Sequence, residues 1–132
     1  MKNPIDHYWT KRLSDVKQAL DGNRFDAYIA ADVKQAGQIV LEEILPQIGP
    51  RTVSWGGSMT FTDSGLYQTI RDNEAYTVLD TFDKKLSKED SLERRRQALL
   101  VDLFITGTNA VTETGKLVNL DMIGNRVGAI TF

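Results

Sequence analysis

A glycine-rich segment near the middle of the chain has the composition of an anion-binding loop. Its residues are Gly56, Gly57, Ser58, Met59 and Thr60. Two glycines allow a backbone to approach a ligand closely, and free amides at the start of a following helix attract anions. The segment lacks both the lysine of a phosphate-binding P-loop and the glycine spacing of a dinucleotide-binding turn. It is therefore either a binding loop, with hydroxyls from Ser58 and Thr60 as further donors, or a tight turn between a strand and a helix.

A second segment surrounds one carboxylate with small and polar residues. Thr106, Gly107 and Asn109 follow an apolar stretch directly, and Glu113 comes next. A carboxylate whose solvation is controlled by packing can act as a general base or as a nucleophile. We expect Glu113 to be a catalytic residue that shares a pocket with Ser58 and Asn109. The alternative is a polar hairpin turn in which Glu113 is fully solvated.

A third segment combines an acid with a base. Asp121 and Arg126 are close enough in sequence to form an ion pair, and Arg126 could instead bind a carboxylate or a phosphate. Asn125 lies beside them as a further ligand-binding candidate. The alternative is a structural turn in which Asn125 is left-handed and Asp121 acts as a cap.

The composition excludes many other kinds of site. The 132 residues contain no cysteine and one histidine, His7. We therefore expect no disulfide, iron–sulfur cluster, metal site, bound cofactor or Ser-His-Asp triad. Sixteen Lys and Arg against eighteen Asp and Glu leave a net charge of −2, which argues against nucleic acid as a partner. No apolar run is long enough to cross a membrane and no signal peptide is evident, so a cytoplasmic location is expected.

Four helices are predicted from apolar spacing and capping residues. Their ranges are 3–21, 33–45, 60–73 and 87–100. Asn3-Pro4 suits the start of the first helix, and Asp32, Thr60 and Ser87 are the expected N-caps of the others. Pro46 is expected to end the second helix, because proline lacks an amide hydrogen.

Strand-forming runs alternate with these helices. The predicted strands are 25–30, 51–55, 76–79, 103–106, 116–120 and 127–132. Alternation of this kind predicts an α/β fold, a three-layer α/β/α Rossmann-like arrangement around a mostly parallel sheet, with antiparallel strands near the C-terminus. Ligands of such sheets bind beyond the carboxyl ends of the strands, which is where the first two segments lie.

Taken together, the three segments resemble the LUD domain, the family of lactate-utilisation protein C. The matching motifs are Gly57-Ser58-Met59-Thr60 with Gly65-Leu66, the run from Asp102 to Asn119, and Asp121 with Gly124-Asn125-Arg126-Val127. The resemblance covers essentially the whole chain. It implies a single domain over residues 1–132, shortened at the C-terminus relative to other LUD domains.

The resemblance also implies a fold similar to that of ribose-phosphate isomerases, glucosamine-phosphate isomerases and class I coenzyme A transferases. Those enzymes bind phosphate or acyl groups at a loop placed like Gly56–Thr60. The transferases carry a nucleophilic Glu in a Ser-Glu-Asn-Gly motif, and Thr112-Glu113-Thr114-Gly115 is a distant version that differs at the first and third positions.

Two functions follow from the resemblance. In the first, the chain is an accessory or catalytic subunit in the oxidation of L-lactate to pyruvate, and it binds a small organic acid or a phosphorylated metabolite while separate iron–sulfur subunits carry the electrons. In the second, it is a non-catalytic module that senses a metabolite or docks to those subunits. An unpaired edge strand at residues 128–132 would also favour a homodimer.

Overall fold

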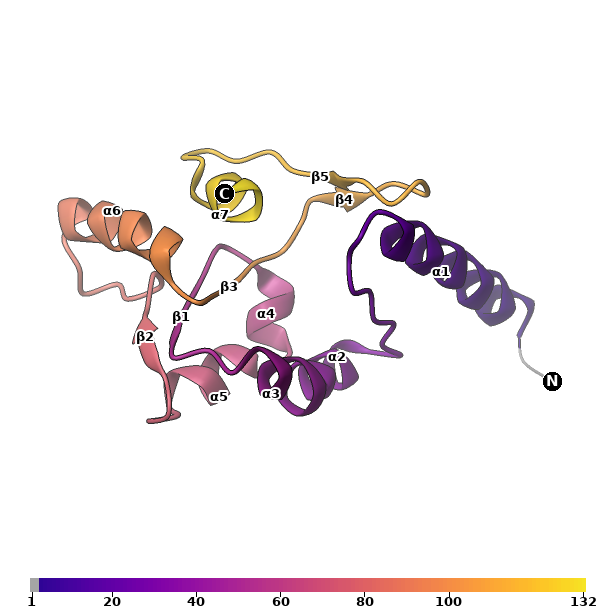
Figure 1. Ribbon diagram of the computed structural model, residues 1–132, viewed down its shortest axis with the longest axis horizontal. Coiled ribbons are helices and arrows are strands. Elements are labelled where there is room, and N and C mark those ends of the chain that lie inside the picture. Colours follow the sequence, from indigo (N-terminus) through magenta and orange to yellow (C-terminus); the bar gives the residue numbers. More distant parts are fainter. Residues whose placement is uncertain (1–2) are drawn as a thin grey trace. The chain divides into compact units, whose positions relative to one another are not determined.

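Figure 1 shows the computed structural model, which describes residues 3–132. The chain forms two compact units. The first comprises the N-terminal part up to Ala31 together with Thr108–Asn119, and the second comprises Asp32–Gly107 together with Leu120–Phe132. No helix within residues 3–132 combines the length and the apolar character that a bilayer crossing requires.

A three-stranded parallel sheet lies at the centre of the second unit, with β1 (Thr52–Trp55) as its middle strand. β2 (Thr77–Leu79) and β3 (Leu103–Ile105) pair with β1 on either side. Helices alternate with these strands along the chain, so the predicted α/β class with a mostly parallel sheet is confirmed. Because the strands are parallel, their carboxyl ends meet at one edge of the sheet.

The core of the second unit lies on one face of β1. Val53 and Trp55 face the same side of the strand and are fully buried, and Ser54 on the opposite side is fully buried as well, as expected for the middle strand of a sheet. Val53 and Trp55 pack against apolar residues of α3 (Leu45–Ile48), α4 (Met59–Asp63) and α5 (Leu66–Arg71), namely Leu45, Phe61, Leu66 and Ile70. The Trp55 ring lies 5.2 Å from Tyr67 and 5.3 Å from Phe61, in edge-on and tilted geometries that aromatic pairs prefer.

The helix after Asp32 confirms one expectation and corrects another. Asp32 caps α2 (Val33–Ile39) as predicted, since its carboxylate accepts the Gln35 amide at 2.7 Å. Pro46 does not end the helix, which passes through a π-helical turn at Val40–Ile44 and continues as α3. The wider turn relieves the clash that a proline ring normally makes with the carbonyl four residues earlier. Gly49, with φ of 58°, ends the helix instead.

The helix after β1 differs from the prediction at its start and in its middle. Ser58 rather than Thr60 is the N-cap, because the Ser58 hydroxyl accepts the Phe61 amide at 3.2 Å. The predicted single helix is divided into α4 and α5 at Gly65, whose φ of 79° is left-handed and therefore interrupts a right-handed helix. The Ser87 cap of α6 (Lys88–Gln97) is confirmed by its 3.0 Å bond from the Asp90 amide.

The prediction of a strand at residues 127–132 is wrong. Residues Asn125–Thr131 form helix α7. The Asp121 carboxylate accepts the amides of Arg126 at 2.7 Å and Val127 at 3.0 Å, and Gly124 supplies the left-handed turn before them. These bonds favour a helix over an extended chain, so the edge-strand argument for a homodimer no longer applies.

The first unit joins a helix to a hairpin. α1 (Pro4–Gly22) begins at Asn3 as predicted, and β4 (Ala110–Val111) pairs antiparallel with β5 (Leu117–Val118). This pair confirms the antiparallel strands expected near the C-terminus. The amide of Asn23 donates to the carbonyls of Thr114 and Gly115 and thereby ties the hairpin turn to the end of α1.

The prediction of a buried strand at residues 25–30 is also wrong. This segment pairs with no strand in the part of the chain that the structure describes, and its large apolar side chains Phe25, Tyr28 and Ile29 are exposed. Its backbone is held locally instead, since the Ala27 amide donates to the Asp21 carboxylate at 3.1 Å. Strand-forming residues do not make a strand where no neighbouring strand satisfies the backbone.

Gly115 allows the hairpin to pack closely against α1. We predict that Gly115→Ala destabilises the first unit. Its φ is 74°, and a Cβ would lie 2.6 Å from the Ala19 carbonyl carbon. The left-handed backbone alone costs about 1–2 kcal/mol, and the overlap adds about 1–3 kcal/mol. Amide hydrogen exchange in α1 measures the loss.

The matched control is Gly49→Ala, because Gly49 has a left-handed φ of 58° with no atom within 4 Å of a Cβ. It should show the backbone cost alone. Equal losses of unfolding free energy in the two variants would contradict the packing role of Gly115.

Candidate functional site

The loops that follow β1 and β3 lie together at the carboxyl edge of the sheet. The Gly56 amide donates to the Ile105 carbonyl at 2.9 Å, so the pairing of the two strands continues into their loops. Beyond this bond the chain after β1 turns into Gly57 and Ser58, and the chain after β3 turns into Thr106 and Gly107. The structure therefore brings the first two predicted segments into contact in this unit.

Two glycines make this contact possible. A Cβ on Gly107 would lie 3.0 Å from the Ser58 hydroxyl oxygen, and a Cβ on Gly56 would lie 2.8 Å from the Thr106 hydroxyl and 2.6 Å from Cγ of Arg126. Gly56 is also buried. Glycine is thus required at both positions where the two loops come into contact.

The amides of Gly57 and Ser58 lie in the loop after β1 and have no hydrogen-bond partner among the described residues. Gly57 is exposed, and no atom of residues 3–132 lies within 4 Å of the place where its Cβ would be. Consecutive free amides beside hydroxyl groups can bind an anion. Met59 and Thr60 continue the loop into α4 and are exposed.

Asp121 and Arg126 support the loops from the third predicted segment. The Arg126 guanidinium donates to the carbonyls of Gly107 at 3.2 Å and Leu120 at 2.8 Å, and its Nε lies 3.7 Å from the Asp121 carboxylate. The side chain of Arg126 is only 14% exposed, and that of Asp121 only 9%. The pair is therefore built into the site as an organising element, while a direct contact of Arg126 with a ligand stays a prediction. Asn125 begins α7 and is partly buried.

The Asp121 carboxylate is held in its charged form. The Val127 amide lowers the pKa of Asp121 most, and the amide and guanidinium of Arg126 lower it further against the opposing effect of burial. A charged Asp121 therefore accompanies the folded α7 at neutral pH.

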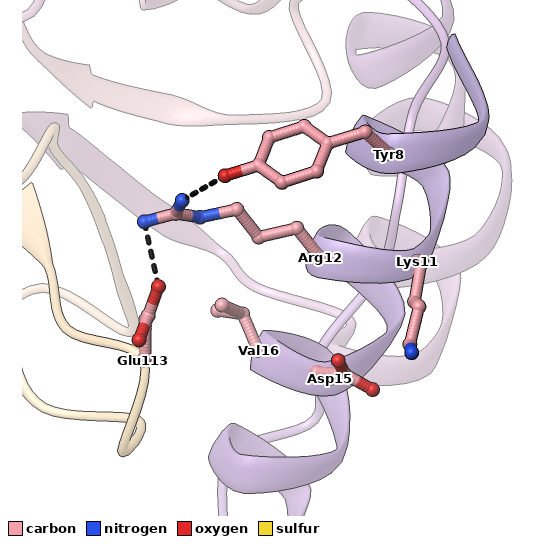
Figure 2. Close-up of a pocket in the computed structure, with 6 residues that line it drawn as sticks. All are labelled: Tyr8, Lys11, Arg12, Asp15, Val16 and Glu113. Atoms are coloured by element: carbon pink, nitrogen blue, oxygen red, sulfur yellow. Dashed lines mark hydrogen bonds and ion pairs between the residues drawn. The ribbon is translucent and has the colours of Figure 1, made fainter. Parts of the chain in front are cut away.

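Glu113 belongs to the first unit, where Arg12 and Tyr8 position its carboxylate. Figure 2 shows Arg12 of α1 reaching from Tyr8 to Glu113, with Nη2 of Arg12 2.6 Å from Oε1 of Glu113 and Nη1 donating to the Tyr8 hydroxyl. The bond to Tyr8 and then the charge of Glu113 raise the pKa of Arg12. The three side chains help to line a cavity of about 350 Å³, together with Lys11, Asp15 and Val16.

The Glu113 side chain is 71% exposed, so packing in its own unit leaves it largely hydrated. Asn109 also lies in the first unit, where its amide donates to the Val118 carbonyl. The pocket that Glu113 and Asn109 were expected to share with Ser58 therefore joins residues of different units and stays a prediction.

Sequence reasoning missed Arg12 and Tyr8 as partners of Glu113. Their spacing places both on one face of α1, but nothing in the sequence links that face to a turn about a hundred residues later. A metal centre has no ligand set here, since residues 3–132 contain no cluster of three or more His, Asp or Glu side chains suited to an ion.

We predict that Asp121→Asn lowers the free energy of unfolding by about 1.5–3 kcal/mol at pH 7, the typical value for hydrogen bonds to a charged group. Because the folded state lowers the pKa of Asp121, its contribution is complete above the unfolded value of about 3.9 and disappears as the pH falls through the lower folded value. Urea titrations should show a constant gap between wild type and variant from pH 7 to 5 that narrows below about pH 4.

Asp63→Asn is the control, because Asp63 is exposed at the end of α4 and has no side-chain partner within residues 3–132. Two results would contradict the stabilising role of the Asp121 carboxylate. One is a difference in unfolding free energy between wild type and Asp121→Asn that stays the same down to pH 3. The other is a difference no larger than that of the control.

Comparison with known proteins agrees with the motifs at the sheet edge. A family model of the LUD domain matches residues 13–132, which include every residue of the three segments. No curated protein and no solved structure matches the chain. Since the family model covers most of the sequence, the chain belongs to the LUD domain family.

Proposed function

We propose that the loops after β1 and β3 bind a small anionic metabolite, either an organic acid or a phosphorylated compound. The observation that supports this proposal best is the pair of unpartnered amides on Gly57 and Ser58. Amides carry a partial positive charge, and two in succession match the oxygens of one carboxylate or phosphate. The hydroxyls of Ser58 and Thr106 lie at the same junction and add donors for a substrate.

The family suggests L-lactate oxidation as the reaction in which this site takes part. Conversion of L-lactate to pyruvate removes two electrons and two protons from the carbinol. The chain has no cysteine for an iron–sulfur cluster, so separate iron–sulfur subunits would accept the electrons. In this scheme Glu113 accepts the hydroxyl proton, and a two-electron acceptor of the partner subunits, such as a flavin or a quinone, takes the carbinol hydrogen with its electron pair and passes the electrons singly to the iron–sulfur clusters. The chain acts in the cytoplasm as a catalytic or accessory subunit.

A non-catalytic sensing or docking module is the second candidate function. It is favoured by the surface of the segment before α7, where Leu120 is 84% exposed and Met122 is 96% exposed. Neighbouring apolar side chains on a surface are typical of a protein interface. It is also consistent with the hydrated, ion-paired state of Glu113.

Gly57→Val tests the binding loop. The substitution places a branched side chain over the free amides, while Gly57 has ordinary backbone geometry and open space around it, so the fold should be retained. We expect at least a tenfold loss of affinity for the ligand that wild type binds, which corresponds to about 1.4 kcal/mol. A thermal-shift screen of L-lactate, pyruvate, ribose 5-phosphate and acetyl-coenzyme A identifies that ligand, and calorimetry measures the affinity.

Gly22→Val is the matched control, because Gly22 also has open surroundings and belongs to the other unit. It should bind as wild type does. Unchanged affinity in Gly57→Val would refute the proposed loop.

Glu113→Gln separates the two candidate functions. The change keeps the shape of the side chain and removes its charge, and it should cost less than about 1 kcal/mol of stability, because exposed ion pairs contribute little. If the chain is catalytic, L-lactate oxidation with a soluble quinone acceptor falls at least a hundredfold, the usual contribution of a general base, while pyruvate affinity changes little.

The control is Glu43→Gln, which removes an exposed carboxylate outside all three candidate segments. It should leave the rate of L-lactate oxidation unchanged. Saturable binding without any turnover by the wild-type chain would contradict catalysis and support the sensing or docking module.

A further inference from the structure

A cavity of about 490 Å³ lies in the second unit, beside the loop that follows β2. Its walls come from that loop and from the first two turns of α6, which Figure 1 shows following β2 along the chain. Thr81 in the wall donates its hydroxyl to the Trp55 carbonyl at 2.7 Å. The cavity therefore adjoins the carboxyl end of β1 and lies at the same sheet edge as the Gly57 loop.

The charged groups around the cavity are mostly cationic. Lys84, Lys88 and Arg95 line it, and Asp83 is the one carboxylate among its lining residues. Asp83 is balanced by Arg94, whose Nη1 lies 3.8 Å from it. The cavity thus keeps a surplus of positive charge.

The cations differ in how they are held. Nη1 of Arg95 donates to the carbonyl and the hydroxyl of Ser91, which orients the guanidinium along α6. The ammonium groups of Lys84 and Lys88 make no hydrogen bond or ion pair with any residue in the range 3–132. Two ammonium groups without protein partners are available to a ligand.

We propose that this cavity binds the phosphate or diphosphate group of a ligand, at a site separate from the Gly57 loop. A phosphate carries up to two charges and several acceptor oxygens, so it can engage several cations at once, whereas a single carboxylate needs only one. Lysine serves as a mobile point charge for phosphate. This inference does not depend on the proposed role in lactate oxidation.

Isothermal titration of the full chain with inorganic pyrophosphate tests the proposal. Wild type should bind, and Lys84→Gln/Lys88→Gln should bind at least about tenfold more weakly, because two charge-assisted contacts are lost. The control is Lys34→Gln/Arg51→Gln, which removes the same net charge from the second unit at residues outside the cavity and its loop. The affinity of the control variant for pyrophosphate should stay within about twofold of that of wild type, since distant surface charges are screened by salt.

Absence of pyrophosphate binding by wild type would overturn the proposal, and so would equal weakening in the two double variants, which would indicate a general effect of charge. Pyrophosphate binding that is lost in Gly57→Val but kept in Lys84→Gln/Lys88→Gln would place the phosphate at the Gly57 loop and would also overturn the proposal. Conversely, the lysine variants should keep the affinity of wild type for L-lactate or pyruvate. A failure of this site is thereby distinguished from a failure of the proposed function.

Discussion

The carboxyl end of β1 is the position on which the second unit depends. Trp55 is fully buried in the aromatic core, and its carbonyl accepts the Thr81 hydroxyl from the loop after β2. Gly56 is the next residue, and its amide donates to β3 at Ile105. Two adjacent residues thus connect the ends of all three strands, and the absence of a side chain on Gly56 leaves room for Thr106 and Arg126. A Cβ at this position would push the loops apart and would separate the groups that form the candidate site.

The fixed position of Trp55 and Gly56 makes the loop after β1 a preorganised set of hydrogen-bond donors. Since the core and the neighbouring strands fix Trp55 and Gly56, the amides of Gly57 and Ser58 are held in place beyond the sheet without bonds of their own. Preorganised donors bind an anion more strongly than mobile ones, because less conformational entropy is lost on binding. Arg126 uses its guanidinium to fix the carbonyls of Gly107 and Leu120, so its contribution is to the shape of the loop.

The sequence was sufficient to predict the parallel sheet and the positions of its loops, because buried strands, caps and glycine-rich turns depend on local residues. It was insufficient where the outcome depends on distant partners. Residues 25–30 have strand-forming side chains but no neighbouring strand, and residues 127–132 become helical because Asp121 captures the first amides of α7. Pro46 is tolerated through a π-helical turn that has no simple sequence signature. The partnership of Arg12 with Glu113 joins residues at opposite ends of the chain, and no local pattern reveals it.

The proposed role in L-lactate oxidation requires that the junction of the loops after β1 and β3 bind a small organic acid. The most direct measurement is a titration of the ¹⁵N-labelled chain with L-lactate and, separately, with pyruvate, followed by the amide resonances in two-dimensional NMR spectra. We expect saturable shifts for at least one of these acids, largest at the amides of Gly57 and Ser58 and smaller at Gly107, with the resonances of α2 and α6 unchanged. Saturable shifts confined to other parts of the chain, or none at Gly57 and Ser58 with either acid up to millimolar concentration, would contradict the proposed role.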